Sequence, residues 1–167
     1  MLASIANHES GLSARNKINQ CFDVVARGIL HKTASEGRTT TTLSNDGDLT
    51  MAVLSGETYL VRFSLVWDMS ASADKPNIIW TIPTLSGNIQ ELWTQLSNGI
   101  APAVTFADSP FVSGLIPAFN SGTNVLEGWV RFTAAAAGTF ALKWANQSGT
   151  GTSTLKIGSW LQVFPAV

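Results

Sequence analysis

Strand periodicity is clearest in Thr58-Tyr59-Leu60-Val61-Arg62-Phe63-Ser64-Leu65-Val66-Trp67-Asp68, and this stretch decides the fold class. Every second side chain in it is large and apolar: Tyr59, Val61, Phe63, Leu65 and Trp67. Successive side chains of a strand point to opposite faces, so this alternation places the large apolar set on one face. The stretch is therefore predicted to be a core strand.

The same period of two recurs on both sides of this stretch. Longer strands are predicted at 124–133, 139–146 and 152–164. Shorter strands are predicted at 39–43, 49–54, 77–82 and 103–106. Turn-forming Gly, Asn, Asp and Pro residues separate these segments. About eight short strands with this spacing predict a mainly β fold, specifically an antiparallel β-sandwich of the jelly-roll type.

The amino-terminal segment has a different period, because its apolar residues recur at helical spacing: Ala14, Ile18, Cys21, Phe22 and Val25. We expect a helix over 13–27, so that residues 1–32 form an arm and residues 33–167 form the β-sandwich domain. An isolated helix of this length is only marginally stable in water, so its apolar stripe must dock. Its partner is its own β-domain, symmetry mates or a larger assembly.

The arm is expected to supply attachment and oligomer contacts. The candidate residues are Leu12, Arg15, Lys17, Ile18, Cys21, Phe22 and Val25. Cys21 lies among apolar helical positions, so a packing thiol is favoured over a reactive one. As the single cysteine of the chain it forms no intrachain disulfide.

The surface of the β-domain is expected to be short of charge. Charged residues make up 13% of the chain, against about 25% in an ordinary soluble domain. Leu60, Val66 and Trp129 also place apolar groups on the strand face opposite the core. A Thr- and Ser-rich exterior would explain the charge deficit, but burial between copies explains both observations. We therefore expect a homo-oligomer, and we choose a trimer over a dimer, which the sequence leaves open.

Several classes of partner are disfavoured. The formal net charge of −1 does not provide the clustered basic residues that grip nucleic acid. The sequence shows neither the pattern of a signal peptide nor an apolar run of about 20 residues, the length that crosses a bilayer. We expect a protein made in the cytoplasm, without a nucleic-acid or membrane partner.

Catalytic candidates are scarce, and we expect no enzyme, cofactor or metal. His8 and His31 lack ligand spacing, and no nucleophile elbow or phosphate-binding glycine loop is present. No carboxylate pair can be nominated for glycoside hydrolysis. Asn45-Asp46-Gly47-Asp48 comes nearest to a cation loop, but an Asx-stabilised hairpin turn is favoured. Asn146-Gln147-Ser148 matches a glycosylation sequon and is interpreted as an ordinary turn.

Tryptophans offer the remaining candidate contacts, because exposed indoles can stack on sugars or anchor interfaces. Trp67, Trp80 and Trp144 fall in strand patterns and are expected in the core. Trp93 lies in the least regular part of the chain, where capping of the core or a subunit contact is favoured over a glycan contact. Trp129 is the second candidate for a ligand or subunit contact.

One resemblance emerges from these motifs. Gly11-Leu12-Ser13-Ala14-Arg15-Asn16-Lys17-Ile18-Asn19 resembles the amino-terminal segment of many tailed-bacteriophage virion proteins. Downstream, Leu54-Ser55-Gly56-Glu57-Thr58-Tyr59, Gly138-Thr139-Phe140-Ala141-Leu142-Lys143-Trp144-Ala145-Asn146 and Gly158-Ser159-Trp160-Leu161 are similar to a domain found in that family. The resemblance implies a structural component of the particle, commonly trimeric, with an outward β-sandwich and an attaching amino-terminal part.

The expected function is therefore a homotrimeric capsid decoration, cement or head-fibre protein located in the virion. Its expected partners are itself and the major capsid protein or other virion proteins. A tail-fibre or collar-associated adhesin that binds a host surface glycan is the alternative. A hydrolase acting on surface polysaccharide is least favoured, because the acid pair is missing.

Overall fold

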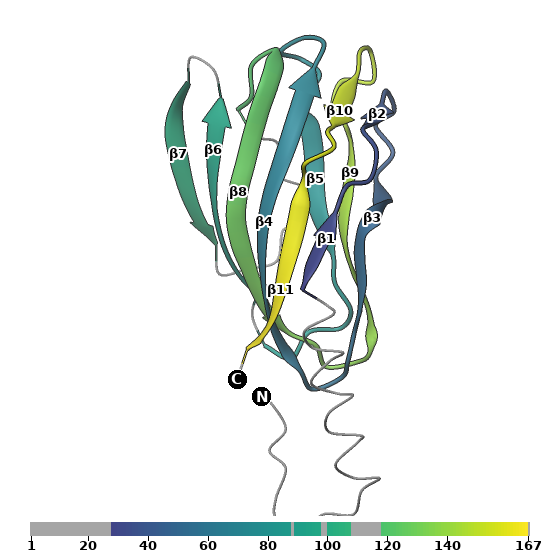
Figure 1. The fold of residues 1–167 in the computed structure, drawn as a ribbon, viewed down its shortest axis with the longest axis vertical. Coiled ribbons are helices and arrows are strands. Elements are labelled where there is room, and N and C mark those ends of the chain that lie inside the picture. Colours follow the sequence, from purple (N-terminus) through teal and green to yellow (C-terminus); the bar gives the residue numbers. More distant parts are fainter. Residues whose placement is uncertain (1–27, 88, 98–99, 108–117, 167) are drawn as a thin grey trace, which may run out of the picture.

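A computed structural model describes residues 28–87, 89–97, 100–107 and 118–166 of the chain. This part of the chain is mainly β, with two antiparallel sheets (Figure 1). The strands are β1 (Ile29–His31), β2 (Glu36–Arg38), β3 (Ser44–Val53), β4 (Thr58–Met69), β5 (Pro76–Thr81), β6 (Gln90–Ser97), β7 (Ile100–Ala107), β8 (Gly122–Thr133), β9 (Gly138–Asn146), β10 (Ser153–Leu155) and β11 (Trp160–Ala166).

The larger sheet has eight strands: six follow the order β1-β11-β4-β8-β6-β7, and β10 pairs with the last residues of β4 while β2 pairs with β10. Strands β4 and β8 form its centre and pair without interruption from Thr58↔Thr133 to Met69↔Gly122. Strands β10 and β11 follow one another along the same edge of β4. The stretch that decides the fold class is thus the middle of the larger sheet.

The smaller sheet has the order β3-β9-β5 and packs against the inner face of the larger one. Aromatic rings join the two sheets: Trp67 of β4 meets Trp144 of β9 edge-on at 4.9 Å between ring centroids. Phe63 of β4 and Trp80 of β5 contact one another in a tilted arrangement, with 5.2 Å between ring centroids. Such pairs add about 0.5–1.5 kcal/mol each beyond the area that they bury. The three tryptophans expected in the core are therefore confirmed there.

Most predicted strands are present, and the differences have local causes. Residues 39–43 connect β2 to β3 instead of forming a strand. The strand predicted at 152–164 is divided into β10 and β11 by a turn at Gly158, whose φ of 99° lies in the left-handed region. The sheet also begins at Ile29, before the expected boundary at residue 32. The predicted helix falls in residues 1–27, outside the described residues.

The two ends of the sandwich differ in what they carry. Val163 N donates to the Gly28 carbonyl at 3.2 Å, so the amino-terminal segment joins the sandwich at the end where β11 finishes (Figure 1). The opposite end carries the β4–β5 connection, residues 70–75, and the β9–β10 connection, residues 147–152. Ser70 N donates to the Thr152 carbonyl at 3.1 Å and links these connections.

Buried side chains order these distal connections. Asp74 is buried and accepts hydrogen bonds from the hydroxyls of Ser70 and Ser148, which hold the pKa of its carboxyl below the ordinary value. Asn146 is also buried, and its Oδ1 accepts from the backbone N–H groups of Ser148 and Gly149, both at 2.8 Å. The turn expected at the sequon is confirmed, and the Asn146 amide is already used inside the domain.

Candidate functional site: where the amino-terminal segment joins the sandwich

Strand β1 ties the amino-terminal segment to the larger sheet. Its three residues pair antiparallel with β11, from Ile29↔Gln162 to His31↔Trp160. Lys32 N extends this pairing by donating to the Ser159 carbonyl at 2.9 Å. So short an edge strand forms few backbone hydrogen bonds, and the side chains that follow it supply further contacts.

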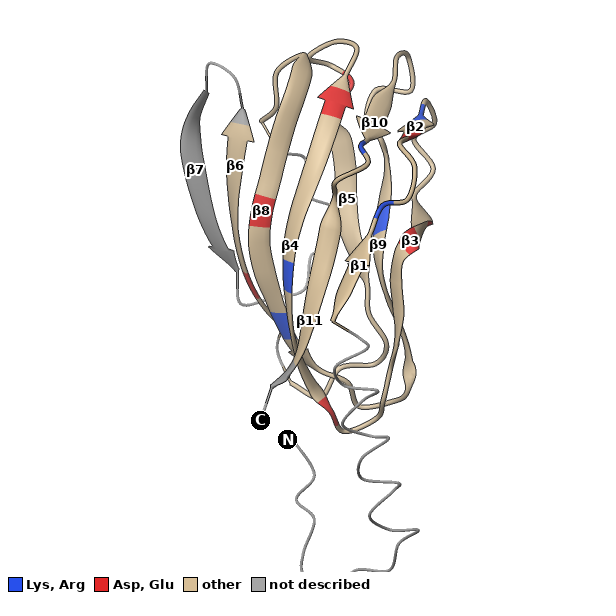
Figure 2. Cartoon of the chain, viewed as in Figure 1, with Lys and Arg blue, Asp and Glu red and all other residues tan. Residues whose placement is uncertain are grey.

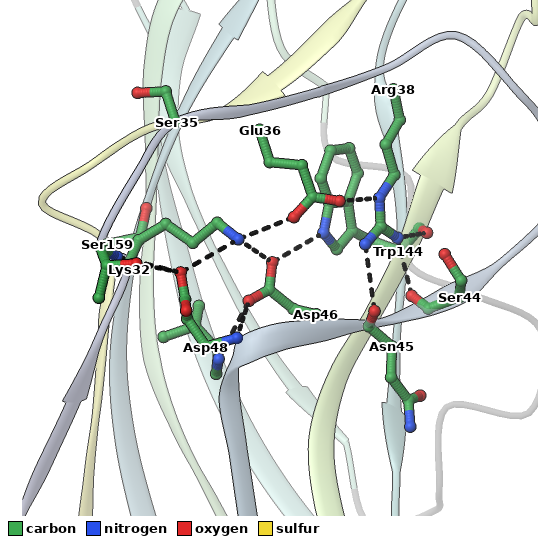
Figure 3. A network of polar contacts seen from close by, with 12 residues as sticks. Lys32, Ser35, Glu36, Arg38, Ser44, Asn45, Asp46, Asp48, Trp144 and Ser159 are labelled. Carbon is green, nitrogen blue, oxygen red and sulfur yellow. Dashed lines mark hydrogen bonds and ion pairs between the residues drawn. The ribbon is translucent and has the colours of Figure 1, made fainter.

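Lys32 is the centre of a buried ion-pair cluster immediately after β1 (Figure 3). Its Nζ lies 2.8 Å from Asp46 Oδ2, 2.8 Å from Glu36 Oε2 and 3.5 Å from Asp48 Oδ2. The Lys32 side chain is 4% exposed and that of Asp46 is 0% exposed. Buried charges persist in proteins when they are paired and hydrogen-bonded, and this pair meets both conditions.

Asp46 is held by a bulge in β3. The register with β9 shifts between Asn45 and Thr50, so Asp46 lies in a bulged stretch and not in the expected hairpin turn. Its Oδ1 accepts from the backbone N–H groups of Asp48 and Leu49, each at 3.0 Å. The Asx-type bonding was thus correctly anticipated, although the hairpin was wrong: the same bonds here shape a bulge that turns a carboxylate inward.

Arg38 closes the cluster on the side of β9. Its Nε donates to Glu36 Oε1 at 2.7 Å, and its Nη1 and Nη2 donate to the carbonyls of Ser44 and Asn45. The guanidinium also lies over the Trp144 ring, 4.0 Å from the centroid. A planar, delocalised cation suits this combination of stacking and several fixed hydrogen bonds. Figure 3 shows the donors and acceptors of the cluster pointing toward one another.

Two groups around the cluster have pKa values that depart from the ordinary ones, Lys32 and Asp48. Burial by itself lowers the pKa of Lys32, but the hydrogen bonds and charges of Asp46 and Glu36 outweigh it and raise that pKa above the ordinary value. The hydrogen bond from the backbone N–H of Thr33 is the main cause that lowers the pKa of Asp48. Among the described residues no group of three or more His, Cys, Asp or Glu side chains is arranged to hold a metal. The Lys32 ammonium occupies the space between the carboxylates.

A second unusual group is the carboxyl of Glu91 on β6. Glu91, Trp93 and Gln95 all point into the sandwich and are buried, and Glu91 is only 1% exposed. Gln95 Oε1 accepts from Ala118 N at 2.9 Å. Within the described part of the chain, neither Glu91 oxygen nor Trp93 Nε1 has a hydrogen-bond partner. Burial raises the pKa of Glu91 to about 8.

Glu91 is therefore expected to make stability depend on pH. Below its ordinary pKa of 4.5 both folded and unfolded chains hold the proton. As pH rises toward about 8, only the unfolded chain releases it, so the free energy of unfolding falls by up to about 1.4 kcal/mol per pH unit. Glu91→Gln should remove this contribution. Denaturant unfolding at pH 5, 6.5 and 8 measures it, with Glu127→Gln as the exposed control; parallel profiles for Glu91→Gln and the unmodified protein would contradict it.

The residues predicted from the sequence are not gathered at one place. All seven attachment candidates, Leu12 to Val25, lie outside the described residues. Trp93 lies on β6 and is buried at 8% exposure, whereas Trp129 is half-buried on the opposite face of the larger sheet. No sequence pattern indicated that Lys32, Glu36 and Arg38 take part in the ion-pair cluster. The one available signal was the Asn45-Asp46-Gly47-Asp48 motif.

Comparison of the sequence with protein families and with curated proteins finds no match. Within the described part of the chain, no helix is both long and apolar enough to cross a membrane.

Proposed function

We propose that this chain is a non-enzymatic structural protein of a bacteriophage particle, a homotrimeric capsid decoration, cement or head-fibre protein anchored through its amino-terminal segment. The observation that carries the proposal is the junction at β1. The described chain enters the sandwich at one end, at Gly28, and is tied there by β1 and the Lys32 cluster, while the β4–β5 and β9–β10 connections lie at the opposite end. This is the arrangement that a displayed module with a single attachment segment requires.

The connection pattern supports a jelly-roll version of the sandwich. The chain passes repeatedly between the two sheets: β3, β5 and β9 are in the smaller sheet, and between and after them β4, then β6 to β8, then β10 and β11 are in the larger. Such alternation wraps the chain around a single core, which leaves a compact module with loops at both ends. A compact module suits a component present in many copies on a particle.

The anchor is tested by deleting residues 1–27, which retains the Gly28 carbonyl that pairs with Val163. We expect binding to particles that lack the protein to be lost, while circular dichroism and thermal unfolding show an intact β-domain. Deleting residues 1–9 is the matched control, because it spares the helical pattern from Ala14 onward. Particle binding by the 1–27 deletion would exclude the segment as the anchor.

The position on the particle is tested by copy number. A decoration or cement protein is expected in many copies on the head, bound to the major capsid protein, and its absence should lower head stability while adsorption to the host is intact. Quantitative mass spectrometry of purified particles, with electron microscopy of labelled protein, measures this. A few copies at the tail, with inhibition of infection by the purified protein, would favour the adhesin that binds a host glycan.

A further inference from the structure

The face of the larger sheet that points away from the smaller sheet, here called the outer face, is rich in apolar side chains. The register aligns Trp160 with Ser64 and Phe164 with Leu60. These side chains therefore lie on the face of the sheet opposite the one that carries the buried Phe63. By the strand registers, the apolar members of the outer face are Ile29, Leu60, Val66, Leu92, Leu96, Val125, Trp129, Trp160 and Phe164. Ile29 is 56% exposed. No other element of the described chain crosses this face in Figure 2.

The charges on the outer face are few and of both signs. Arg62 of β4 and Glu127 and Arg131 of β8 are exposed and lie on this face by register, and Figure 2 shows charged positions of both signs along these two strands. Arg62 is aligned with Trp129, and Glu127 is the neighbouring residue on the same face of β8. A nucleic-acid site would present clustered basic groups alone. A face with mixed charge around apolar side chains is complementary to itself, and two half-buried indoles are typical anchors of protein interfaces.

The area of the outer face can be compared with that of a standard protein interface. Strands about 4.8 Å apart and a rise of about 3.3 Å per residue give five strands over seven residues a planar area of roughly 550 Å². In a trimer this area is divided between two neighbours, so each contact has about half of it; with side-chain relief, the two contacts of one copy together approach the roughly 800 Å² that each partner buries in a standard interface. Burial of this face between copies would also account for a charged fraction of only 13%.

We infer that three copies pack around a three-fold axis parallel to the strands, with the β11 half of one outer face against the β8–β6 half of the next. Trp160 and Phe164 of one copy then meet Trp129 and Leu92 of its neighbour. This inference rests on the proposed trimer. The axis follows from the end of the sandwich at which Gly28 lies: rotation about an axis parallel to the strands keeps the three Gly28 residues at one end, so that the residues before them can reach a common surface.

The test is the mass of the full-length protein in solution, measured with reductant present so that Cys21 does not link copies. The unmodified protein should have three times the 17.7 kDa of one chain. Trp129→Glu and Trp160→Glu should each give folded monomers. The control is Ile157→Glu, at a turn residue that is 60% exposed and outside the outer face, and it should stay trimeric. A monomeric or dimeric unmodified protein, or trimers in both tryptophan variants, would overturn the arrangement.

Mixing Trp129→Glu with Trp160→Glu tests which halves of the outer face contact one another. The β11 half of one copy meets the β8–β6 half of the next, or identical halves meet. Trp160→Glu leaves the β8–β6 half intact and Trp129→Glu leaves the β11 half intact. If unlike halves meet, the mixture forms a one-to-one complex although each variant alone is monomeric; a mixture that stays monomeric would overturn the pairing. Circular dichroism of each variant excludes unfolding as the cause. Because these measurements use no particles, a trimer that fails to bind heads defeats the proposed attachment alone. A monomer that binds heads defeats this inference together with the proposed trimer and leaves the proposed attachment standing.

Discussion

Lys32→Met is expected to lower the free energy of unfolding by about 3–5 kcal/mol, the range found when one partner of a buried ion pair is removed. The substitution leaves the Asp46 carboxylate, 0% exposed, without the ammonium 2.8 Å away. The Asp46 hydrogen bonds to Asp48 and Leu49 hold it in place, so it cannot turn toward water. Denaturant unfolding at pH 7 measures the loss.

Two variants make this experiment specific. Lys156→Met removes an exposed pair, in which Nζ lies 3.8 Å from Asp68 Oδ2, and should cost no more than about 1 kcal/mol. Adding Asp46→Asn to Lys32→Met removes the stranded charge but keeps an oxygen for the two backbone N–H groups, so at least half of the loss should be recovered. A Lys32→Met loss no larger than that of Lys156→Met would show that the cluster is not a stabilising junction.

Gly128→Ala is expected to cost about 3 kcal/mol or more, at or above the upper end of ordinary overpacking. Gly128 lies on β8 between Phe63 of β4 and Trp93 of β6. A Cβ added there would be 2.2 Å from the Leu92 carbonyl oxygen, 2.8 Å from the Trp93 Cα and 2.9 Å from the Phe63 ring. Two of these are backbone atoms, so relief requires β6 to move away from β8 and lose ladder hydrogen bonds.

The matched control is Gly47→Ala, because an added Cβ at Gly47 meets no heavy atom within 4 Å. Its effect on the free energy of unfolding should stay within about 0.5 kcal/mol. Thermal and denaturant unfolding of the two variants measure the difference. Similar stabilities for Gly128→Ala and Gly47→Ala would mean that β6 is not packed against β8 as described.

The central strands could be predicted because their pattern is local. The large side chains of β4 alternate strictly between the core and the outer face of the sheet, and those of β8 do the same. Strand β6 could not be found in this way, because its inward set includes Glu91 and Gln95, polar residues at core positions that break the alternation. The Thr-rich residues 39–42 favour a strand by propensity, but in the structure they connect β2 to β3.

The junction could be predicted only in part. The Asx bonding of Asp46 spans a few residues and leaves a motif in the sequence. Its partner Lys32 is distant in the chain, and the bulge that brings them together depends on the register of β3 with β9. Apolar residues on the second face of β4 and β8 were visible as a pattern, but their alignment into one outer face required the strand order.

The antiparallel pairing of β1 with β11 has a mechanical consequence. Strand β1 runs from the end of the sandwich inward, so tension applied through the residues before Gly28 acts along the strand axis. The backbone hydrogen bonds to β11 are then sheared together instead of being opened one after another. Lys32, at the inner end of β1, adds its ion pairs against the same sliding motion. A short strand that would peel easily from the side therefore resists being drawn out lengthwise.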